Sequence, residues 1–178
     1  MKATGIVRRI DDLGRVVIPK EIRRTMRIRE GDPLEIYTDA NGEVIFKKYS
    51  PIGELGPYTK QYAEVLHRTT GQAAAICDRD RVIAAAGVPK RDLLEKRISQ
   101  ALEARMEQRE LFVSDGVQPL PVSDDAAQTA MLMAPIIGAG DVLGAVLLLA
   151  ESPQALPSQV DLKLVQVAAG FLGKQMEE

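Results

Sequence analysis

Four arginines lie close together near the N-terminus, at Arg8, Arg15, Arg23 and Arg24. A guanidinium group suits phosphate because its planar fork donates two hydrogen bonds at once. Residues 1–29 contain nine Lys or Arg and three Asp or Glu, a net charge of +6. Residues 51–178 contain 12 Lys or Arg and 17 Asp or Glu, a net charge of −5. A basic segment on an acidic chain predicts a nucleic-acid-binding module, with ordinary solvated arginines as the alternative.

Arg9 and Lys20 are weaker candidates for the same surface. Arg9 follows Arg8 in a predicted strand, so the two side chains point to opposite faces. We therefore expect Arg9 to pair with an acidic residue. Asp11 and Asp12 are expected to brace the neighbouring turn, or to pair an arginine, rather than to bind metal.

The elements that present these arginines follow from local signals. β-Branched residues at Val7 and from Val16 to Ile18 predict two strands, joined by a turn at Leu13-Gly14. Pro19 ends the second strand and starts a short helix over 20–26. Two further strands, 34–38 and 43–49, flank the hairpin signal Asn41-Gly42. Residues 1–50 therefore form one β-β-α-β-β domain with too few large apolar groups to be stable alone, so we expect dimerisation by hairpin pairing.

A second domain is predicted over 58–178, after a linker over 51–57 rich in proline and glycine. Helices are expected at 58–70, 90–110 and 158–176, and strands at 72–78, 82–86, 111–113, 130–137 and 142–150. This order predicts an α+β domain, an antiparallel sheet flanked by helices. The last helix is apolar over more than half of its circumference, so we expect part of it to pack on another subunit and to form a tetramer.

Catalysis and metal binding find no support in the sequence. His67 and Cys77 are the only residues of their kinds. His67 is expected to be solvated or to cap a helix, and Cys77 to be buried in a strand. No Cys/His cluster predicts zinc, and no cofactor is predicted. A single cysteine excludes an intrachain disulfide and favours the cytoplasm. No apolar run is long enough for a membrane span.

Residues 1–50 resemble the DNA-binding domain of the AbrB-type transition-state regulators. The resemblance rests on the runs 1–8, 12–19, 23–24, 34–37 and 46–49. It implies a dimer of swapped hairpins closed into a β-barrel. It also implies that Arg8, Arg15, Arg23 and Arg24 contact double-stranded DNA. Because no recognition helix of ordinary length is predicted, we expect backbone contacts and DNA shape to contribute more to affinity than base readout.

The second domain resembles a GAF domain in its order of elements. The two domains together resemble a family of sporulation transcription regulators, which implies activation and repression of sporulation genes in the developing spore. The GAF resemblance suggests ligand sensing. The polar loop 114–128 is then the candidate lid over a pocket, although a plain surface loop is favoured slightly. The residues that could line the pocket are Ser114, Asp115, Ser123, Asp124 and Asp125.

There are three alternatives to this interpretation. A ligand-regulated enzyme with a DNA-binding appendage is one, but the sequence lacks a nucleophile–base pair or a metal-binding set for it. The second domain could serve oligomerisation only. The chain could also be an antitoxin, in which a similar N-terminal domain precedes a toxin-binding tail. Such tails tend to be short and disordered, whereas this chain continues with a long periodic apolar pattern, which argues against that alternative.

Overall fold

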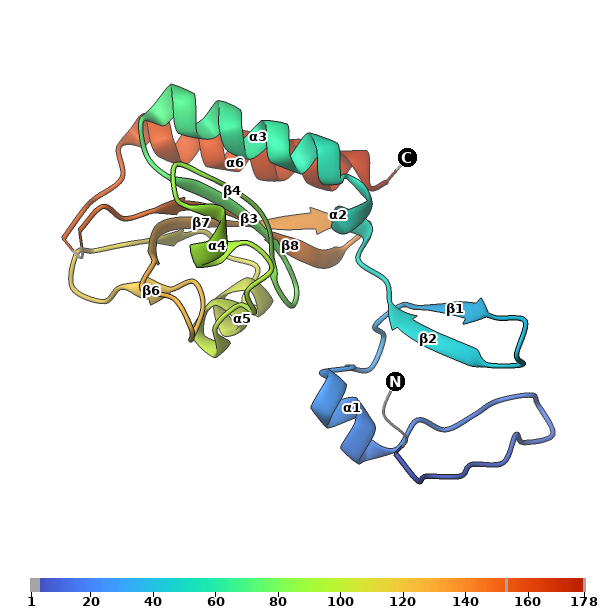
Figure 1. Ribbon diagram of the computed structural model, residues 1–178. Coiled ribbons are helices and arrows are strands. Elements are labelled where there is room, and N and C mark those ends of the chain that lie inside the picture. The colour runs from blue at the N-terminus through green and yellow to red at the C-terminus, as the bar shows by residue number, and fades with distance from the viewer. Residues whose placement is uncertain (1–3, 153, 178) are drawn as a thin grey trace. The chain divides into compact units, whose positions relative to one another are not determined.

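The computed structural model describes residues 4–152 and 154–177, and the chain forms two compact units, Met1–Tyr49 and Ser50–Glu178 (Figure 1). We call them unit 1 and unit 2. Both mix helices with antiparallel strands, so the predicted α+β class is confirmed. Within the described residues, no helix is long and apolar enough to cross a membrane.

The described residues of unit 1, 4–49, form one short helix and one β-hairpin. The helix is α1 (Lys20–Met26), at the bounds that the sequence predicts. Strands β1 (Leu34–Thr38) and β2 (Val44–Lys48) pair antiparallel, with Leu34 opposite Lys48. Asp39 closes the tip of the hairpin, because its Oδ1 accepts hydrogen bonds from Asn41 N and Glu43 N.

The two strands expected before α1 do not form a ladder. Within residues 4–19, Asp11 N donates to Arg15 O across the predicted turn at Leu13-Gly14, yet neither side forms a β-strand. Val7 and Val17 are 87% and 70% exposed. Pro19 is the only residue in 4–49 that is buried when backbone and side chain are taken together. A strand requires a neighbouring strand for its backbone groups, and a single chain does not supply one here.

Unit 2 is built on one six-stranded antiparallel sheet. Its main path runs β4 (Val82–Ala86), β3 (Ala74–Asp78), β8 (Asp141–Leu149), β7 (Thr129–Gly138) and β5 (Phe112–Val113). The short β6 (Leu120–Pro121) also pairs with β7. The strongly apolar β7 and β8 lie inside the sheet, as their composition predicts, and form the hairpin Gly138↔Asp141.

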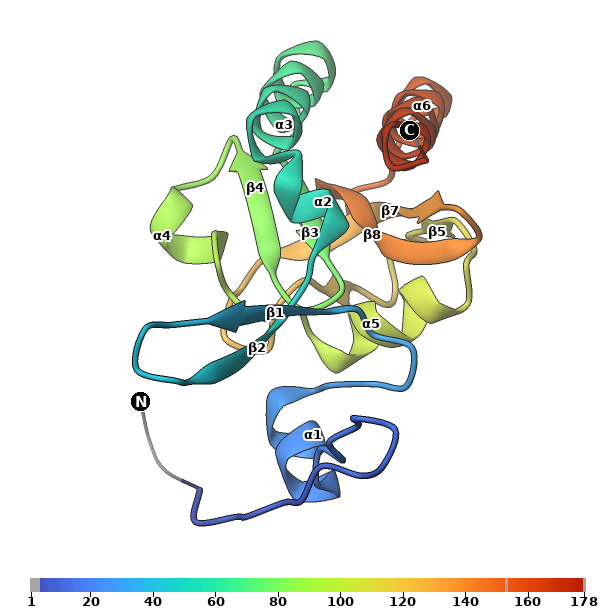
Figure 2. The same ribbon diagram turned by 90° about the vertical axis from the view of Figure 1, so that its right-hand side faces the viewer.

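Helices cover both faces of this sheet. Helices α3 (Gly56–Thr70) and α6 (Gln159–Gln175) lie side by side on one face (Figure 2). Helices α4 (Lys90–Leu93) and α5 (Gln100–Glu107) lie on the other. Alternate residues of β3 enter the two cores: Ile76 packs with the α3 and α6 side, and Cys77 with the α5 side. This alternation is the period of two of a strand buried on both faces.

The segment 51–57, expected as a linker, is helical instead. Helix α2 (Pro51–Glu54) starts there, and Ile52 is fully buried in the core of unit 2. Pro51 occupies the first helical turn, where its missing N–H is not needed, and Ser50 Oγ accepts from Gly53 N. Ser50 Oγ also donates to Asp78 Oδ2 at 3.0 Å. Ser50 therefore holds the start of unit 2 against the end of β3.

The long helix predicted over 90–110 is wrong. The chain forms α4, leaves the helix at Leu94, and resumes as α5 behind the cap Ser99, whose Oγ accepts from Leu102 N. The intervening backbone bonds to the start of β4, because Glu95 N donates to Val82 O and Val82 N donates to Lys96 O. Sheet hydrogen bonds and a serine cap therefore override a helical apolar period.

Helix α6 has a buried stripe and an exposed apolar stripe. Ser158 and Asp161 form a capping box at its start. Its inner stripe is fully or nearly fully buried against β7 and β8: Val165, Ala168, Ala169, Leu172 and Gly173. Its outer side leaves large apolar side chains exposed: Val160, Val167 and Phe171. The sequence predicts this two-sided apolar character.

Candidate nucleic-acid interface

Helix α1 presents two of the predicted arginines to solvent. Arg23 and Arg24 lie in its last turn, and no residue of the helix is buried. Arg23 N donates to Pro19 O at 2.9 Å at the start of the helix. At its end, Arg27 adopts a left-handed conformation with φ 51°, and its N–H bonds the carbonyls of Arg23 and Arg24. The backbone at both arginines is therefore held by hydrogen bonds while their side chains are exposed.

Arg15 lies beside the turn that precedes α1 and is held by Asp11. Arg15 Nε donates to Asp11 Oδ2 at 2.8 Å, and Arg15 N donates to Asp11 Oδ1 at 2.8 Å. Leu13 N donates to the same Oδ1 at 3.0 Å. These hydrogen bonds, first from the Arg15 backbone and then from its guanidinium, lower the pKa of Asp11. The prediction that Asp11 braces the turn and pairs an arginine is confirmed.

The remaining cations of the predicted surface are exposed. Arg8 and Arg9 lie in the extended segment before the turn, and Lys20 begins α1. Among the described residues Arg9 forms no ion pair, so the expected acidic partner of Arg9 is not found. Arg23 and Arg24 share one helical turn, whereas Arg15 and Arg8 lie elsewhere in unit 1.

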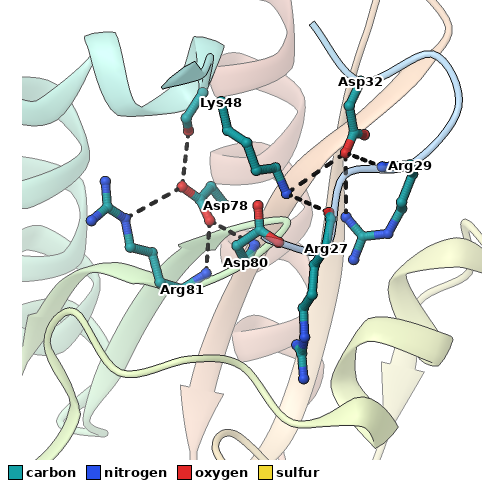
Figure 3. Close-up of polar contacts among 8 residues, drawn as sticks. Arg27, Arg29, Asp32, Lys48, Asp78, Asp80 and Arg81 are labelled. Atoms are coloured by element: carbon teal, nitrogen blue, oxygen red, sulfur yellow. Dashed lines mark hydrogen bonds and ion pairs between the residues drawn. The ribbon is translucent and has the colours of Figure 1, made fainter. Parts of the chain in front are cut away.

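A cluster that the sequence interpretation missed joins the segment that follows α1 to Lys48 at the end of β2 (Figure 3). Asp32 Oδ2 accepts from Arg29 N at 2.8 Å and lies 3.6 Å from Lys48 Nζ. Lys48 Nζ also donates to Arg27 O at 2.9 Å. The available signal was the turn Arg29-Glu-Gly-Asp-Pro33, where aspartate commonly accepts nearby backbone N–H groups.

The five residues predicted to line a ligand pocket lie in two separate loops. Ser114 and Asp115 follow β5, whereas Ser123, Asp124 and Asp125 follow β6. Both serines are buried, and their hydroxyls accept hydrogen bonds from the backbone of their own loops, Gly116 N and Asp125 N.

The acidic members of this set are exposed. Asp115 Oδ1 accepts from Val117 N and Gln118 N, and these hydrogen bonds lower the pKa of Asp115. The carbonyl of Asp125 accepts from Lys96 Nζ at 2.8 Å. The pocket stays a prediction, because the observed roles of these residues are turn formation and loop bracing.

His67 and Cys77 take structural positions in unit 2. His67 Nδ1 lies 2.9 Å from Gln72 O, so the ring links the end of α3 to the segment before β3. The sequence predicts a solvated or a helix-capping His67, whereas this contact is made to a carbonyl outside α3. Cys77 is fully buried, and burial raises the pKa of its thiol to about 12. Across residues 4–152 and 154–177, no cluster of three or more His, Cys, Asp or Glu could hold a metal ion.

The second unit identifies the family. Residues 54–177 match the family described as stage V sporulation protein T C-terminal, transcription factor. The chain belongs to this family. Stage V sporulation protein T of Bacillus subtilis (strain 168) is 51% identical over 180 aligned positions, which cover 100% of both chains. The resemblance to sporulation transcription regulators is therefore confirmed.

Unit 1 has relatives of its own. The transition state regulatory protein AbrB of Bacillus subtilis (strain 168) is 63% identical over 51 residues, 29% of this chain and 52% of AbrB. Residues 7–53 also match the family described as antidote-toxin recognition MazE, bacterial antitoxin.

Unit 2 has the GAF fold. The crystal structure of the GAF domain from Acinetobacter phosphoenolpyruvate-protein phosphotransferase matches with a TM-score of 0.55 and 10% identity. The match covers 71% of this chain and 87% of that domain. The predicted pairing of an AbrB-like unit with a GAF-like unit is confirmed.

Proposed function

We propose that this chain is a transcription regulator that binds double-stranded DNA through Arg8, Arg15, Arg23 and Arg24 of unit 1. The observation that supports this most strongly is the exposure of all four arginines on a unit 63% identical to AbrB over 51 residues. Each phosphate contact adds about −0.9 to the slope of log K against log salt, so several arginines per protomer give strongly salt-dependent binding. Arg9 and Lys20 add weaker contacts.

The biological role proposed for this surface follows the relative that matches over the whole chain. Stage V sporulation protein T is a sporulation protein by name, so we propose control of sporulation genes, by activation and by repression. Such a role requires access to the chromosome, which favours the cytoplasm of the developing spore.

DNA binding is tested by fluorescence anisotropy with duplex DNA over a series of salt concentrations. We expect Arg15→Ala and Arg23→Ala to weaken binding and to make the salt slope shallower. Arg105→Ala is a matched control, because Arg105 lies in unit 2 with its guanidinium 5.5 Å from the ring of Phe112. Full affinity and an unchanged salt slope in both unit 1 variants would exclude this surface.

The proposed DNA-binding form is a dimer through unit 1. Support comes from the segment 4–19, which lacks a ladder in the single chain and exposes Val7, Ile10 and Val17. A second copy of this segment would supply both the missing strand partner and the missing apolar contacts. The dimer would also double the number of arginines available to one duplex.

We further propose that unit 2 joins two such dimers into a tetramer. Support comes from the exposed apolar side chains of the adjacent helices α3 and α6. These are Tyr58 and Val65 on α3, and Val160, Val167 and Phe171 on α6. Exposed apolar residues gathered on neighbouring helices are typical of a protein interface.

Ligand control through unit 2 is the remaining part of the proposal. The GAF fold supports it, and the loops containing Ser114, Asp115, Ser123, Asp124 and Asp125 are the proposed site. Calorimetry with nucleotides and amino acids tests it. If no compound binds while the tetramer is intact, unit 2 serves oligomerisation.

An antitoxin is the second candidate function, favoured by the match of residues 7–53 to the MazE family. The remainder of the chain argues against it, because residues 54–177 match a transcription-factor family and form a folded unit with two cores. An enzyme is less compatible still. The Cys77 thiol is buried with its pKa raised to about 12, so it is not a nucleophile at neutral pH.

A further inference from the structure

The carboxylate of Asp32 is unusual within unit 1. Its side chain is only 4% exposed, in a unit where most side chains are exposed. A carboxylate removed from water requires hydrogen bonds or cations to offset its desolvation. A negative charge in a DNA-binding unit also repels phosphate. The partners of Asp32 therefore matter for its role.

Those partners connect Asp32 to the end of the arginine helix. Asp32 Oδ2 accepts from Arg29 N and lies 3.6 Å from Lys48 Nζ, while Lys48 Nζ donates to Arg27 O (Figure 3). The guanidinium of Arg29 lies 4.0 Å from the same oxygen. The buried carboxylate thus holds both the segment that leaves α1 and the ammonium group that caps it.

The last step of the connection is the backbone of α1 itself. Arg27 is the left-handed residue that ends the helix, and the next residue, Ile28, donates its N–H to Arg23 O at 2.8 Å. The backbone of Arg23 is therefore bonded to the segment that Asp32 and Lys48 hold against the end of β2. A shift of that segment moves the last turn of α1, and both arginines with it.

We infer that Asp32 is a positioning residue for DNA binding: with Lys48 it holds the end of α1 so that Arg23 and Arg24 face the duplex. This inference rests on the proposed DNA-binding function. It makes a prediction opposite in sign to simple electrostatics. Removing an acidic charge near DNA strengthens binding if the charge acts only by repulsion, but weakens binding if the carboxylate places the arginines.

The test compares Asp32→Asn with Glu30→Gln in the full chain, by anisotropy with duplex DNA over a salt series. Glu30 is exposed in the same turn, so its variant makes the same charge change without breaking this cluster. We expect Asp32→Asn to bind about tenfold more weakly at an unchanged salt slope, because the arginines are placed less well while every phosphate is still neutralised. Glu30→Gln is expected to bind as well as the unaltered chain or better.

Two further measurements complete the test. Arg24→Ala tests the proposed DNA binding separately. It should make the slope of log K against log salt shallower by about 0.9 for each phosphate that Arg24 neutralises. Amide NMR shifts of Arg23 and Arg24 should change in Asp32→Asn even without DNA. The inference is overturned if Asp32→Asn binds DNA as tightly as the unaltered chain or more tightly. It is also overturned if the substitution leaves those amide shifts unchanged. An inert Arg24→Ala would instead overturn the proposed function.

Lys48→Met provides a second variant in case Asp32→Asn melts unit 1. We expect weaker binding at an unchanged salt slope, with rescue by Lys48→Arg, which retains a cationic donor. Lys47→Met is the matched control, since Lys47 Nζ instead lies 5.5 Å from the Tyr37 ring centroid. A lower salt slope in Lys48→Met would make Lys48 a phosphate-binding residue and would overturn its positioning role.

Discussion

Arg15 and Asp11 are joined twice, once through the Arg15 backbone and once through its guanidinium, each at 2.8 Å. The turn between them is therefore closed by the same carboxylate that orients the arginine. A DNA phosphate that approached Arg15 would meet a side chain already held near the turn, with one guanidinium nitrogen engaged by Asp11. The pair is exposed, so its strength depends on salt.

The first prediction concerns the ionisation of Asp11. Hydrogen bonds from the backbone and then the side chain of Arg15 hold the pKa of Asp11 below its ordinary value of 3.8. The folded pKa is thus lower than the unfolded one. The stabilisation of the turn is present above the unfolded pKa and is lost as pH falls through the folded pKa. An NMR titration of the Asp11 carboxyl carbon should give a lower midpoint than in a peptide of residues 8–18.

Arg15→Ala serves as the control for this titration. It removes the guanidinium but keeps the Arg15 backbone N–H, which is the larger cause, so the midpoint should rise only part of the way. If Asp11 in the unaltered protein titrates with the same midpoint as in the peptide, the observed hydrogen bonds are contradicted.

The second prediction concerns the packing of α6 on β7. A Cβ at Gly173 would overlap the carbonyl oxygen of Ile137, so any side chain there forces the helix away from the strand. We expect Gly173→Ala to lower the free energy of unfolding of unit 2 by about 1–3 kcal/mol. Thermal and urea unfolding measure this difference.

Gly170 provides a matched control one turn earlier in α6. A Cβ at Gly170 meets nothing within 4 Å. Gly170→Ala should therefore raise the free energy of unfolding by up to about 1 kcal/mol, because alanine favours the helix more than glycine. Equal destabilisation by both substitutions would show that space at Gly173 does not control helix packing.

Several elements could be predicted from sequence because their stabilising partners are close in the chain. The β1–β2 hairpin follows from alternating apolar residues around Asn41-Gly42, and β7 and β8 follow from two apolar runs around a glycine turn. Helix α1 follows from Pro19 and the residues after it. The arginines of the candidate interface could be proposed from the local excess of positive charge and from the resemblance to AbrB-type domains, because exposed cations are recognisable without knowledge of the fold.

Other elements could not be predicted because their partners are distant. The spacing of Leu94, Ile98, Leu102 and Met106 predicts one helix, yet the backbone at Glu95 and Lys96 bonds to the start of β4. Asp32 looked like an ordinary turn residue, because its partner Lys48 is 16 positions away. The strands expected around Val7 and Val16 lack a partner strand within the described chain. The expected dimer is consistent with this, because it pairs hairpins between two chains.

The third prediction concerns the reactivity of Cys77. The thiol is fully buried, with its sulfur 3.9 Å from Met106 Sδ, and its pKa is raised to about 12. In the native protein we expect no reaction with a thiol-specific disulfide reagent at pH 8, and one reacted thiol per chain in guanidinium chloride.

The same burial contributes to the loss of stability of unit 2 at alkaline pH. The folded pKa of Cys77 lies above its ordinary value of 9.0, so the folded state retains a proton that the unfolded state loses. The contribution of the protonated Cys77 thiol to the stability of unit 2 is fully present below the unfolded pKa. It is lost as pH rises from 9 towards 12. Cys77→Ala should remove this part of the alkaline decline in urea midpoints. An identical decline in that variant would assign it to other groups.

The last prediction tests the exposed apolar surface of α3 and α6. Val167 is 67% exposed in the middle of α6, on the side opposite its buried stripe. If this surface joins two dimers, a charge there must be desolvated without a partner, which opposes association strongly. We expect Val167→Asp to halve the mass measured by sedimentation equilibrium. The free energy of unfolding of unit 2, measured by thermal unfolding, should stay within about 0.5 kcal/mol of its value in the unaltered protein. Val117→Asp is the control, because Val117 is 78% exposed in the loop after β5, so the same change there should preserve the assembly. An unchanged mass in Val167→Asp, confirmed with Val160→Asp, would place the dimer–dimer interface elsewhere or show that the chain stops at the dimer formed by unit 1.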